Sequence, residues 1–166
     1  LRVLRKICTD NNVLLIFDEI ITGIGRTGRM FAAETFGVTP DVLCTAKGLS
    51  GGYAPLSAMI CRESIGDVFW GPIEENPGFV EGHTFEGNPI SCAAGIAVLR
   101  EILERDLLTN ARAQGDRLRA GFEGLAAKYG VIGDIRGKGL FQAVEFVKDL
   151  QTKERFPANP GFGVQV

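Results

Sequence analysis

Two polar side chains in this sequence stand where short predicted strands end, and their types suit amine chemistry. Residues 13–17 are five apolar residues in a row, and Asp18 follows them at once. Lys47 comes two residues after a second predicted strand, residues 41–45. A strand that is apolar on both faces is typical of a buried parallel sheet with helices on either side, and ligands of such sheets bind beyond the carboxyl ends of the strands. The pattern therefore predicts a carboxylate and an amine, both buried, at neighbouring strand ends.

The pairing of Asp18 with Lys47 has two interpretations. One is a structural ion pair, but burying both charges costs free energy, and apolar side chains in their place are often as stabilising. The other is catalytic: a lysine amine that forms an imine, together with a carboxylate that keeps a ring nitrogen protonated. Those are the two groups that pyridoxal phosphate (PLP) requires from a protein. Spacing alone leaves both interpretations open.

The composition is that of a globular protein with a core of its own. The 166 residues are 45% hydrophobic and 23% charged. A formal net charge of -2 provides no basic field, which argues against partners such as nucleic acids or anionic membranes. No apolar run approaches the ~20 residues that span a bilayer, so we expect a soluble, cytoplasmic protein. The four cysteines lack metal-ligand spacing and are expected to be buried free thiols: Cys8, Cys44, Cys61 and Cys92.

The first part of the chain is predicted to alternate strands with short helices and loops. Residues 29–36 form a short helix that ends at Gly37, a typical position for glycine after a helix. Residues 56–61 are the third predicted strand. Residues 70–89 are rich in glycine and proline and form a long loop, and loops of this length in compact domains are usually functional or disordered. The aromatic and acidic residues of this loop favour an ordered one.

Two helices are predicted to follow. The first, residues 90–104, starts well, because Asn88 can accept the first free N–H groups and Pro89 suits the first helical position. The second, residues 107–129, carries an apolar stripe at helical spacing on the side expected to pack, and a charged side expected to face solvent. The stripe is Leu118, Phe122 and Leu125, and the charged side is Arg112, Asp116, Arg119 and Glu123.

The last part of the chain changes in character. Residues 131–139 read as a glycine-rich connection, and residues 140–147 suit an antiparallel strand. This change predicts a boundary, with residues 1–105 in one domain and residues 106–166 at the start of a second, smaller and incomplete domain.

Both ends of the sequence look internal. The first eight residues have helical spacing with no capping residue before them, and residues 162–166 stop without a polar tail. We therefore expect the sequence to be part of a longer polypeptide, and the 166-residue chain alone to be incomplete as an enzyme.

Four ordered motifs carry a resemblance to a known family: residues 18–28 (DEIITGIGRTG), 40–41 (PD), 45–55 (TAKGLSGGYAP) and 82–89 (GHTFEGNP). They closely resemble the class III PLP-dependent aminotransferases, and the similarity continues into residues 135–140. The resemblance implies the fold of the fold type I PLP transferases. In that fold a large α/β domain holds a mostly parallel sheet flanked by helices, and here the start of an α+β C-terminal small domain follows it.

The resemblance also implies roles for individual residues. Lys47 is expected to hold the cofactor as an internal aldimine (Schiff base) and to carry the proton of the reaction. Asp18 is expected to bind the pyridinium N–H, and Ile20 to press against the ring. Thr84 is expected to donate to the cofactor phosphate from the neighbouring subunit of a homodimer. Ile21 stands where many members have a glutamine that binds the phenolic oxygen of the cofactor.

The activity that the resemblance implies is ping-pong transamination through the Lys47 aldimine. An amine or ω-amino acid gives its amino group to a keto acid such as pyruvate or 2-oxoglutarate. The apolar Ile21 resembles the ω-amino-acid or amine:pyruvate branch more than the ornithine or 4-aminobutyrate branch.

Alternatives to transamination are a related class III enzyme, namely a dialkylglycine decarboxylase, an aminomutase or an amino-acid epimerase, or a non-catalytic truncated remnant. The presence of Lys47, Asp18 and Thr84 together argues against a remnant. Glu19 is expected to be a hydrogen-bond partner rather than a catalytic acid, because Lys47 already supplies proton transfer.

Overall fold

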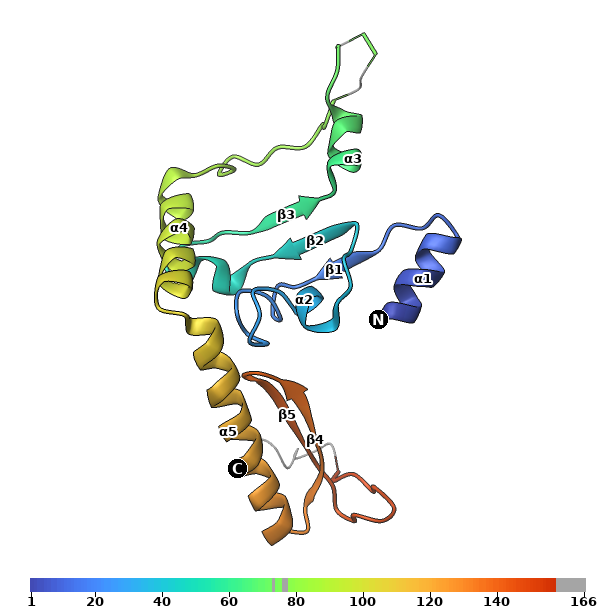
Figure 1. Cartoon of the computed structure of the whole chain (residues 1–166), viewed down its shortest axis with the longest axis vertical. Coiled ribbons are helices and arrows are strands. Elements are labelled where there is room, and N and C mark those ends of the chain that lie inside the picture. Colours follow the sequence, from blue (N-terminus) through green and yellow to red (C-terminus); the bar gives the residue numbers. More distant parts are fainter. Residues whose placement is uncertain (73, 76–77, 158–166) are drawn as a thin grey trace.

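The computed structural model describes residues 1–72, 74–75 and 78–157 and shows an elongated molecule (Figure 1). A three-stranded sheet with its short helices occupies one half. A long helix with a two-stranded hairpin beside it occupies the other half. Residues 162–166, which the sequence predicts to be an internal end of a longer chain, lie outside the described residues.

The sheet holds the three predicted strands in the order β1 (Ile16–Asp18), β2 (Val42–Thr45) and β3 (Ala58–Cys61). Strands β1 and β2 are parallel, and β3 is antiparallel to β2. The connection from β2 to β3, residues 46–57, contains only the short helix η1 (Lys47–Ser50). It therefore reverses the chain and does not supply the crossover that a parallel strand needs.

The prediction of a β1 strand buried on both faces is wrong for this chain. Ile16 is 59% exposed, and among the described strands β1 pairs only with β2. Packing is confined to one side, where Leu15 meets Cys8 and Val38 in a small core, with Phe17 half-buried against it. The unbroken apolar run thus predicted the strand correctly, but it did not predict which of its two faces is buried by other elements.

Helix α1 (Arg2–Asp10) supplies Cys8 to that core, and no side chain caps its first turn. Helix α2 (Ala32–Phe36) begins three residues later than predicted and ends at Gly37, as predicted. Gly37 has a φ of 62°, in the left-handed region that glycine adopts without strain. After β3 the chain forms the short helices α3 (Glu63–Gly66) and η2 (Asp67–Phe69).

The described part of the loop between η2 and α4 is irregular and exposed; residues 73, 76 and 77 of the predicted loop lie outside the description. Helix α4 (Pro89–Glu104) then begins where the sequence predicts. Asn88 Oδ1 accepts the N–H groups of Ile90 at 3.0 Å and Ser91 at 3.2 Å. Helix α4 packs on η1, so the sheet and this helix together hold the segment that carries Lys47.

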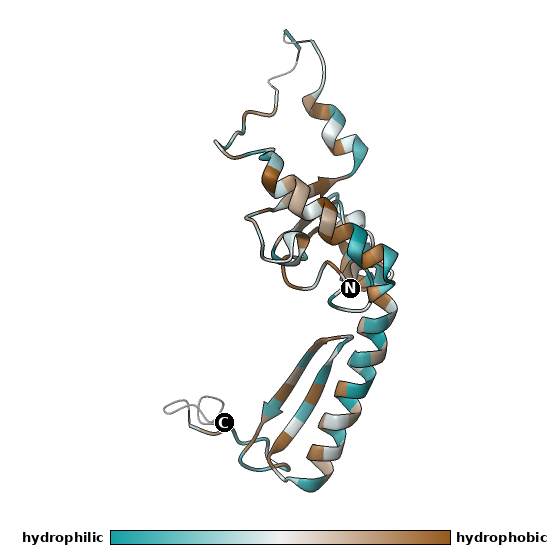
Figure 2. Ribbon diagram, turned by 90° about the vertical axis from the view of Figure 1, so that its left-hand side faces the viewer, coloured by the Kyte–Doolittle hydropathy of each residue, from teal (hydrophilic) through white to brown (hydrophobic). Residues whose placement is uncertain are grey.

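Helix α5 (Leu107–Lys128) runs beside a hairpin of β4 (Ile132–Lys138) and β5 (Phe141–Phe146) (Figure 2). The antiparallel strand predicted at residues 140–147 is confirmed as β5. The glycine-rich connection predicted at residues 131–139 is wrong, because β4 lies there. Its alternation of half-buried and exposed residues is obscured in the sequence by glycines, one of which lies at a register shift.

The charged side of α5 is exposed as predicted, except at the half-buried Arg119, and two of its arginines also contact other elements. Arg112 Nη1 donates to the Gly28 carbonyl at 2.6 Å, and Arg119 Nη2 donates to the Ile135 carbonyl at 3.2 Å. In contrast, Leu125 of the apolar stripe is 46% exposed. Small residues of α5 make the close contact: a side chain on Gly115 would collide with the backbone of Gly139 at the hairpin tip.

All four cysteines are free, and the prediction that they are buried is confirmed for Cys8 and wrong for Cys61, which is exposed. Cys44 and Cys92 are half-buried. Within the described ranges, no helix has the length and apolar character to cross a membrane. The same part of the chain contains no group of three or more His, Cys, Asp or Glu residues able to hold a metal ion.

Candidate active site

The carboxyl ends of β1 and β2 bring Asp18 and Lys47 to one edge of the sheet. Asp18 is the last residue of β1 and lies opposite Cys44 of β2. Strand β2 ends one residue later, and Lys47 opens η1 directly beyond it. Because parallel strands point the same way, both ends lie at the same edge, where ligands of α/β sheets bind. The predicted placement at neighbouring strand ends is confirmed.

Asp18 is exposed in this chain, so its predicted burial is wrong. Its Oδ1 accepts the N–H of Ile20 at 3.0 Å. Among the described residues its Oδ2 has no hydrogen-bond or ion-pair partner. The carboxylate lines a hollow between α1, β1 and α2, with Leu1, Leu4 and Phe36 among its walls. One oxygen of Asp18 is thus held by the backbone, and the other has no partner among the described residues.

Lys47 is also exposed, and its amino group forms no hydrogen bond or ion pair with any described residue. The structural ion pair with Asp18 is therefore absent from this part of the chain. The backbone of Lys47 has a φ of 46°, in the left-handed region that side chains rarely adopt. Such conformations cost of order 1–3 kcal/mol and cluster at functional sites. Lys47 lines a hollow with Ser50, Tyr53 and Pro55, separate from the hollow at Asp18.

The glycine-rich turn after β1 reaches back to the segment that carries Lys47. A Cβ on Gly48, the residue after Lys47, would lie 3.2 Å from Ile24 Cβ. Gly25 and Gly28 have φ values of 86° and 84°, in the left-handed region that glycine adopts without strain, so these glycines allow the chain to make this turn. The turn thus packs against the lysine loop on one side and, through Gly28, against Arg112 of α5 on the other.

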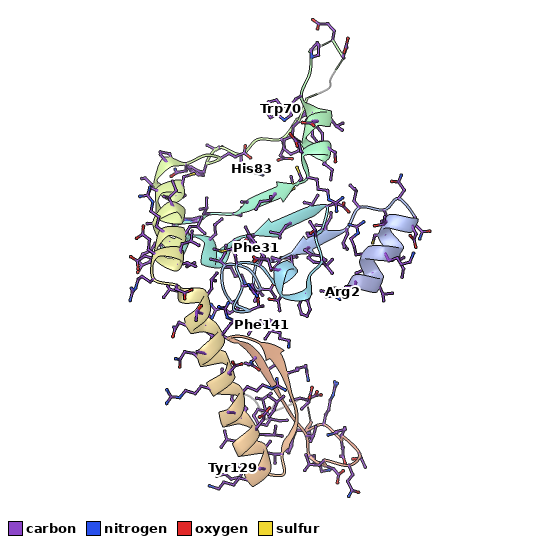
Figure 3. The ribbon with its side chains drawn as sticks, viewed as in Figure 1. Arg2, Phe31, Trp70, His83, Tyr129 and Phe141 are labelled. Carbon is purple, nitrogen blue, oxygen red and sulfur yellow. The ribbon has the colours of Figure 1, made fainter. Side chains whose placement is uncertain are left out.

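Glu19 is a hydrogen-bond partner, as predicted, and the structure adds its partners. Its side chain is buried, and the carboxylate accepts the N–H groups of Ala32 and Ala33 at 2.7 and 2.6 Å and the hydroxyl of Thr22 at 3.0 Å. The sequence did not indicate these partners. One signal was present: Phe31 precedes α2 and cannot cap it, so the free N–H groups of its first turn need an acceptor from elsewhere (Figure 3).

Three predicted site residues remain. Ile20 and Ile21 come shortly after Asp18, whereas Thr84 lies much later in the sequence. Ile20 is half-buried beside Asp18, and Ile21 is 52% exposed. Thr84 lies in an exposed turn just before α4, directly after His83, which Figure 3 labels on the stretch between α3 and α4. In the described residues no hydrogen bond joins Thr84 to Asp18 or Lys47. The structure therefore brings two of the five residues to the sheet edge by topology, with Ile20 and Ile21 next to them.

A family model for class III aminotransferases matches residues 1–166. The chain belongs to the class III aminotransferases. A putrescine aminotransferase from Pectobacterium atrosepticum is 45% identical over 150 residues, which are 90% of this chain and 31% of that protein. Among solved structures, an amine transaminase from an uncultivated Pseudomonas species, in its PLP-bound internal aldimine form, is 40% identical, with a TM-score of 0.86. The match covers 95% of this chain and 36% of that one.

A Bacillus anthracis aminotransferase has a TM-score of 0.90 at 35% identity, and the match covers 95% of this chain and 35% of that one. The neighbours are PLP transaminases, so the fold predicted from the resemblance, a fold type I PLP transferase, is confirmed. This class III chain spans about a third of the length of these relatives.

Class III aminotransferases use PLP, and the donors in this chain suit that cofactor. PLP needs a primary amine to bind its carbonyl carbon and a carboxylate to hold its ring nitrogen. Lys47 offers an amine with no partner among the described residues, and Asp18 offers a carboxylate with one oxygen unused. Both side chains are accessible from one edge of the sheet. The residues present therefore fit the cofactor of the family.

Asp41 lies at the opposite end of the same strands, directly before β2, although the sequence predicted it as the first residue of that strand. Asp41 is buried, and its carboxylate accepts the N–H of Leu15 at 2.7 Å and an N–H of Arg5 at 2.6 Å. Arg62 Nε lies 3.2 Å from its second oxygen. The N–H of Leu15 and the Arg5 guanidinium hold the pKa of the Asp41 carboxyl below its usual value. Asp41 ties α1, β1 and β3 together.

Proposed function

We propose that the full-length protein is a PLP-dependent transaminase that moves an amino group from an amine or ω-amino acid to a keto acid such as pyruvate or 2-oxoglutarate. The observation that carries the proposal is the placement of two side chains at neighbouring strand ends. Within the described ranges the Lys47 amine has no partner, and the Asp18 carboxylate has one oxygen without a partner. Membership of the class III aminotransferases supports the reaction class. The relatives named putrescine aminotransferase and amine transaminase favour an amine as the donor.

In this proposal Lys47 has two tasks. Its Nζ would hold the cofactor through the carbonyl carbon, with water as the leaving group. Once a substrate amine has displaced it, the same Nζ, now a free amine, would move a proton away from the substrate carbon. Both tasks need a free amine, and the absence of any described partner for Nζ supports them. When bound, PLP supplies an electron sink for the substrate carbon that loses its proton.

Asp18 is proposed to hold a proton on the cofactor ring nitrogen. The N–H of Ile20 fixes Oδ1 of Asp18 at 3.0 Å, which leaves Oδ2 as the acceptor for the ring N–H. The Ile20 side chain is proposed to pack against the ring, and the apolar Ile21 to mark the branch that acts on ω-amino acids or amines. Without a glutamine amide at position 21, the phenolic oxygen of the cofactor would have no donor from this residue.

Thr84 is proposed to donate its hydroxyl to the cofactor phosphate of the neighbouring subunit, so that the active unit is a homodimer. Two observations support this. Thr84 is exposed and forms no hydrogen bond with the described residues, and its turn is joined to Asp18 or Lys47 by no described hydrogen bond. Exposed apolar side chains flank it, with Val80 91% exposed, as expected of a surface that a partner covers.

We also propose that the chain divides into two domains, residues 1–105 and residues 106–166. The two sheets lie on either side of it, and Asp106 has a φ of 46° between α4 and α5. This left-handed conformation interrupts the helix, so that α4 ends beside the first sheet and α5 begins the part of the chain that packs on the hairpin.

The test uses the full-length protein and the absorption of lysine-bound PLP. We expect purified protein to show this absorption, and candidate amines or ω-amino acids to bleach it. Lys47→Ala abolishes the absorption, whereas Lys6→Ala, an exposed lysine paired only with Asp10, leaves it unchanged. Absence of the absorption in the wild-type protein, or its persistence in Lys47→Ala, would contradict the proposal.

Product analysis separates the related enzymes. A transaminase consumes a keto acid and forms one amino acid for each amine lost. A decarboxylase releases carbon dioxide, an aminomutase returns an isomer of its substrate, and an epimerase changes only the configuration. A non-catalytic remnant changes none of these substrates.

A further inference from the structure

Glu19 directly follows Asp18 but has the opposite environment. Asp18 is exposed, whereas Glu19 is 2% exposed, which puts it among the most buried side chains described. Successive residues at a strand end point to opposite faces of the sheet. The Glu19 N–H extends the pairing of β1 with β2 by donating to the Cys44 carbonyl at 2.8 Å. The strand end therefore turns one carboxylate outward and the next one inward.

The buried Glu19 carboxylate is fully engaged. A buried carboxylate is costly unless hydrogen bonds replace its lost hydration. Here Ala32 and Ala33 donate their backbone N–H groups and Thr22 donates its hydroxyl. The acidic side chain thus caps the first turn of α2 from thirteen residues earlier in the chain. It ties the end of β1 to the start of α2.

The backbone around Glu19 is fixed as firmly as its side chain. The Glu19 carbonyl accepts the N–H of Gly23 at 2.9 Å. A Cβ on Gly23 would lie 2.7 Å from that carbonyl oxygen, so a larger residue would force this turn apart. Ile20, which lies inside this fixed segment, donates its N–H to Asp18 Oδ1. The orientation of the Asp18 carboxylate therefore depends on where Glu19 holds residues 19–23.

We propose that Glu19 is a positioning residue: by capping α2 and fixing residues 19–23, it keeps the Ile20 N–H on Asp18 and so aims the free Asp18 oxygen at the cofactor ring nitrogen. The proposal rests on the proposed function of Asp18. The competing interpretation is that Glu19 stabilises α2 and nothing more. A purely structural role lowers the thermal stability but leaves cofactor binding by the folded protein unchanged.

The main variant is Glu19→Gln in the full-length protein. Glutamine keeps the size of the side chain, but its amide NH₂ then faces a backbone N–H of α2, so one donor loses its acceptor. The matched control is Glu34→Gln. Glu34 accepts the N–H of Phe31 at 3.0 Å at the start of the same helix, yet it is exposed and has no described bond to residues 18–23.

Two readouts are compared below the unfolding temperature of every variant. The first is hydrogen exchange in the cofactor-free protein, at peptides containing Ile20 and Ala32–Ala33. The second is the Kd of PLP with the pH dependence of the absorption of the lysine-bound cofactor. Glu19→Gln raises the exchange at both places and the Kd roughly tenfold and shifts the pH profile, as expected for loss of a hydrogen bond to a charged group. Glu34→Gln stays within about twofold of wild type.

Thr22→Val provides a milder variant should Glu19→Gln fail to fold. It removes one of the three donors to Glu19, and we expect changes in the same direction of roughly threefold. An unchanged Kd, pH profile and Ile20 exchange in the folded Glu19 or Thr22 variant would overturn the proposal, as would equal changes in Glu34→Gln. Failure of the proposed function gives a different result, because the wild-type protein itself then shows no PLP bound to Lys47. That result would also overturn the proposed role of Glu19.

Discussion

The aspartates at the two ends of the β1–β2 pair, Asp41 and Asp18, have opposite environments. At the amino end Asp41 is buried, and both of its oxygens are engaged by Leu15, Arg5 and Arg62. At the carboxyl end Asp18 uses one oxygen and Lys47 has no described partner. The strands are the same and both acids are aspartates, so the difference comes from their neighbours. Charges that the fold satisfies hold the fold together, and charges that it leaves unsatisfied are available to a ligand.

The largest effect predicted by this comparison is on activity and comes from Lys47→Ala in the full-length protein. We expect the turnover with an amine donor to fall roughly 1,000-fold or more, because the proposed nucleophile and proton carrier are lost together. The melting temperature of the cofactor-free protein should stay close to that of wild type, because Lys47 is exposed and makes no described bond. Lys6→Ala is the control. A large drop in stability of Lys47→Ala would place the lysine with the structural charges instead.

Asp18→Asn is the next largest. Asparagine can still accept the Ile20 N–H, but it has no negative charge to hold a proton on the ring nitrogen. We expect turnover to fall on the order of 100-fold, with the melting temperature of the cofactor-free protein little changed. Steady-state kinetics and thermal unfolding measure the two effects. Wild-type turnover in this variant would remove Asp18 from the site.

Asp41→Asn is expected to have the opposite effect, a loss of stability with little change in turnover. We expect the free energy of unfolding to fall by about 2 kcal/mol, because hydrogen bonds from Arg5 and Leu15 to a buried carboxylate are weakened. Activity of the folded protein should remain. Denaturant unfolding and kinetics measure both. Asp10→Asn is the control, since Asp10 pairs only with Lys6 on the surface and should change stability by less than about 1 kcal/mol. Equal changes in the free energy of unfolding of the two variants would contradict the structural role of Asp41.

The smallest effect is on the pH dependence of stability. The pKa of Asp41 is lower in the folded protein than in the unfolded one, so its contribution to stability is complete above the unfolded value of about 3.9. It is lost as pH falls through the lower folded pKa, since the carboxylate is then protonated in both states. Denaturant unfolding at a series of acidic pH values should show a steeper loss of stability for wild type than for Asp41→Asn. Parallel curves would mean that Asp41 carries no such linkage.

The sequence predicted the residues at the carboxyl end of β1 and β2 better than the contacts at the amino end. The positions of Asp18 and Lys47 followed from local features: an apolar run, a chain direction and a motif. The partners of Asp41 could not be predicted in this way, because Arg5 lies 36 positions away in the sequence and its contact depends on how α1 packs. The same holds for the three donors to Glu19, two of which come from the start of α2.

Burial and helix faces were the weakest predictions, for a related reason. Periodicity shows which residues of α5 share a face, but not which element packs against that face. Arg112 and Arg119 therefore turned out to contact the glycine turn and β4. Likewise, an apolar run predicted β1 but not which of its faces would be covered, and Ile16 is exposed on the outer strand.

The central claim is that Lys47 is the residue that binds the cofactor, and one measurement tests it directly. Full-length protein loaded with PLP is treated with sodium borohydride, which fixes the cofactor permanently to the lysine that holds it, and is then digested with trypsin. Trypsin does not cleave after a modified lysine, so the account predicts an uncleaved peptide of residues 30–62 that carries the cofactor mass on Lys47. A cofactor label on any other lysine, or complete cleavage after Lys47 with no label, would contradict it.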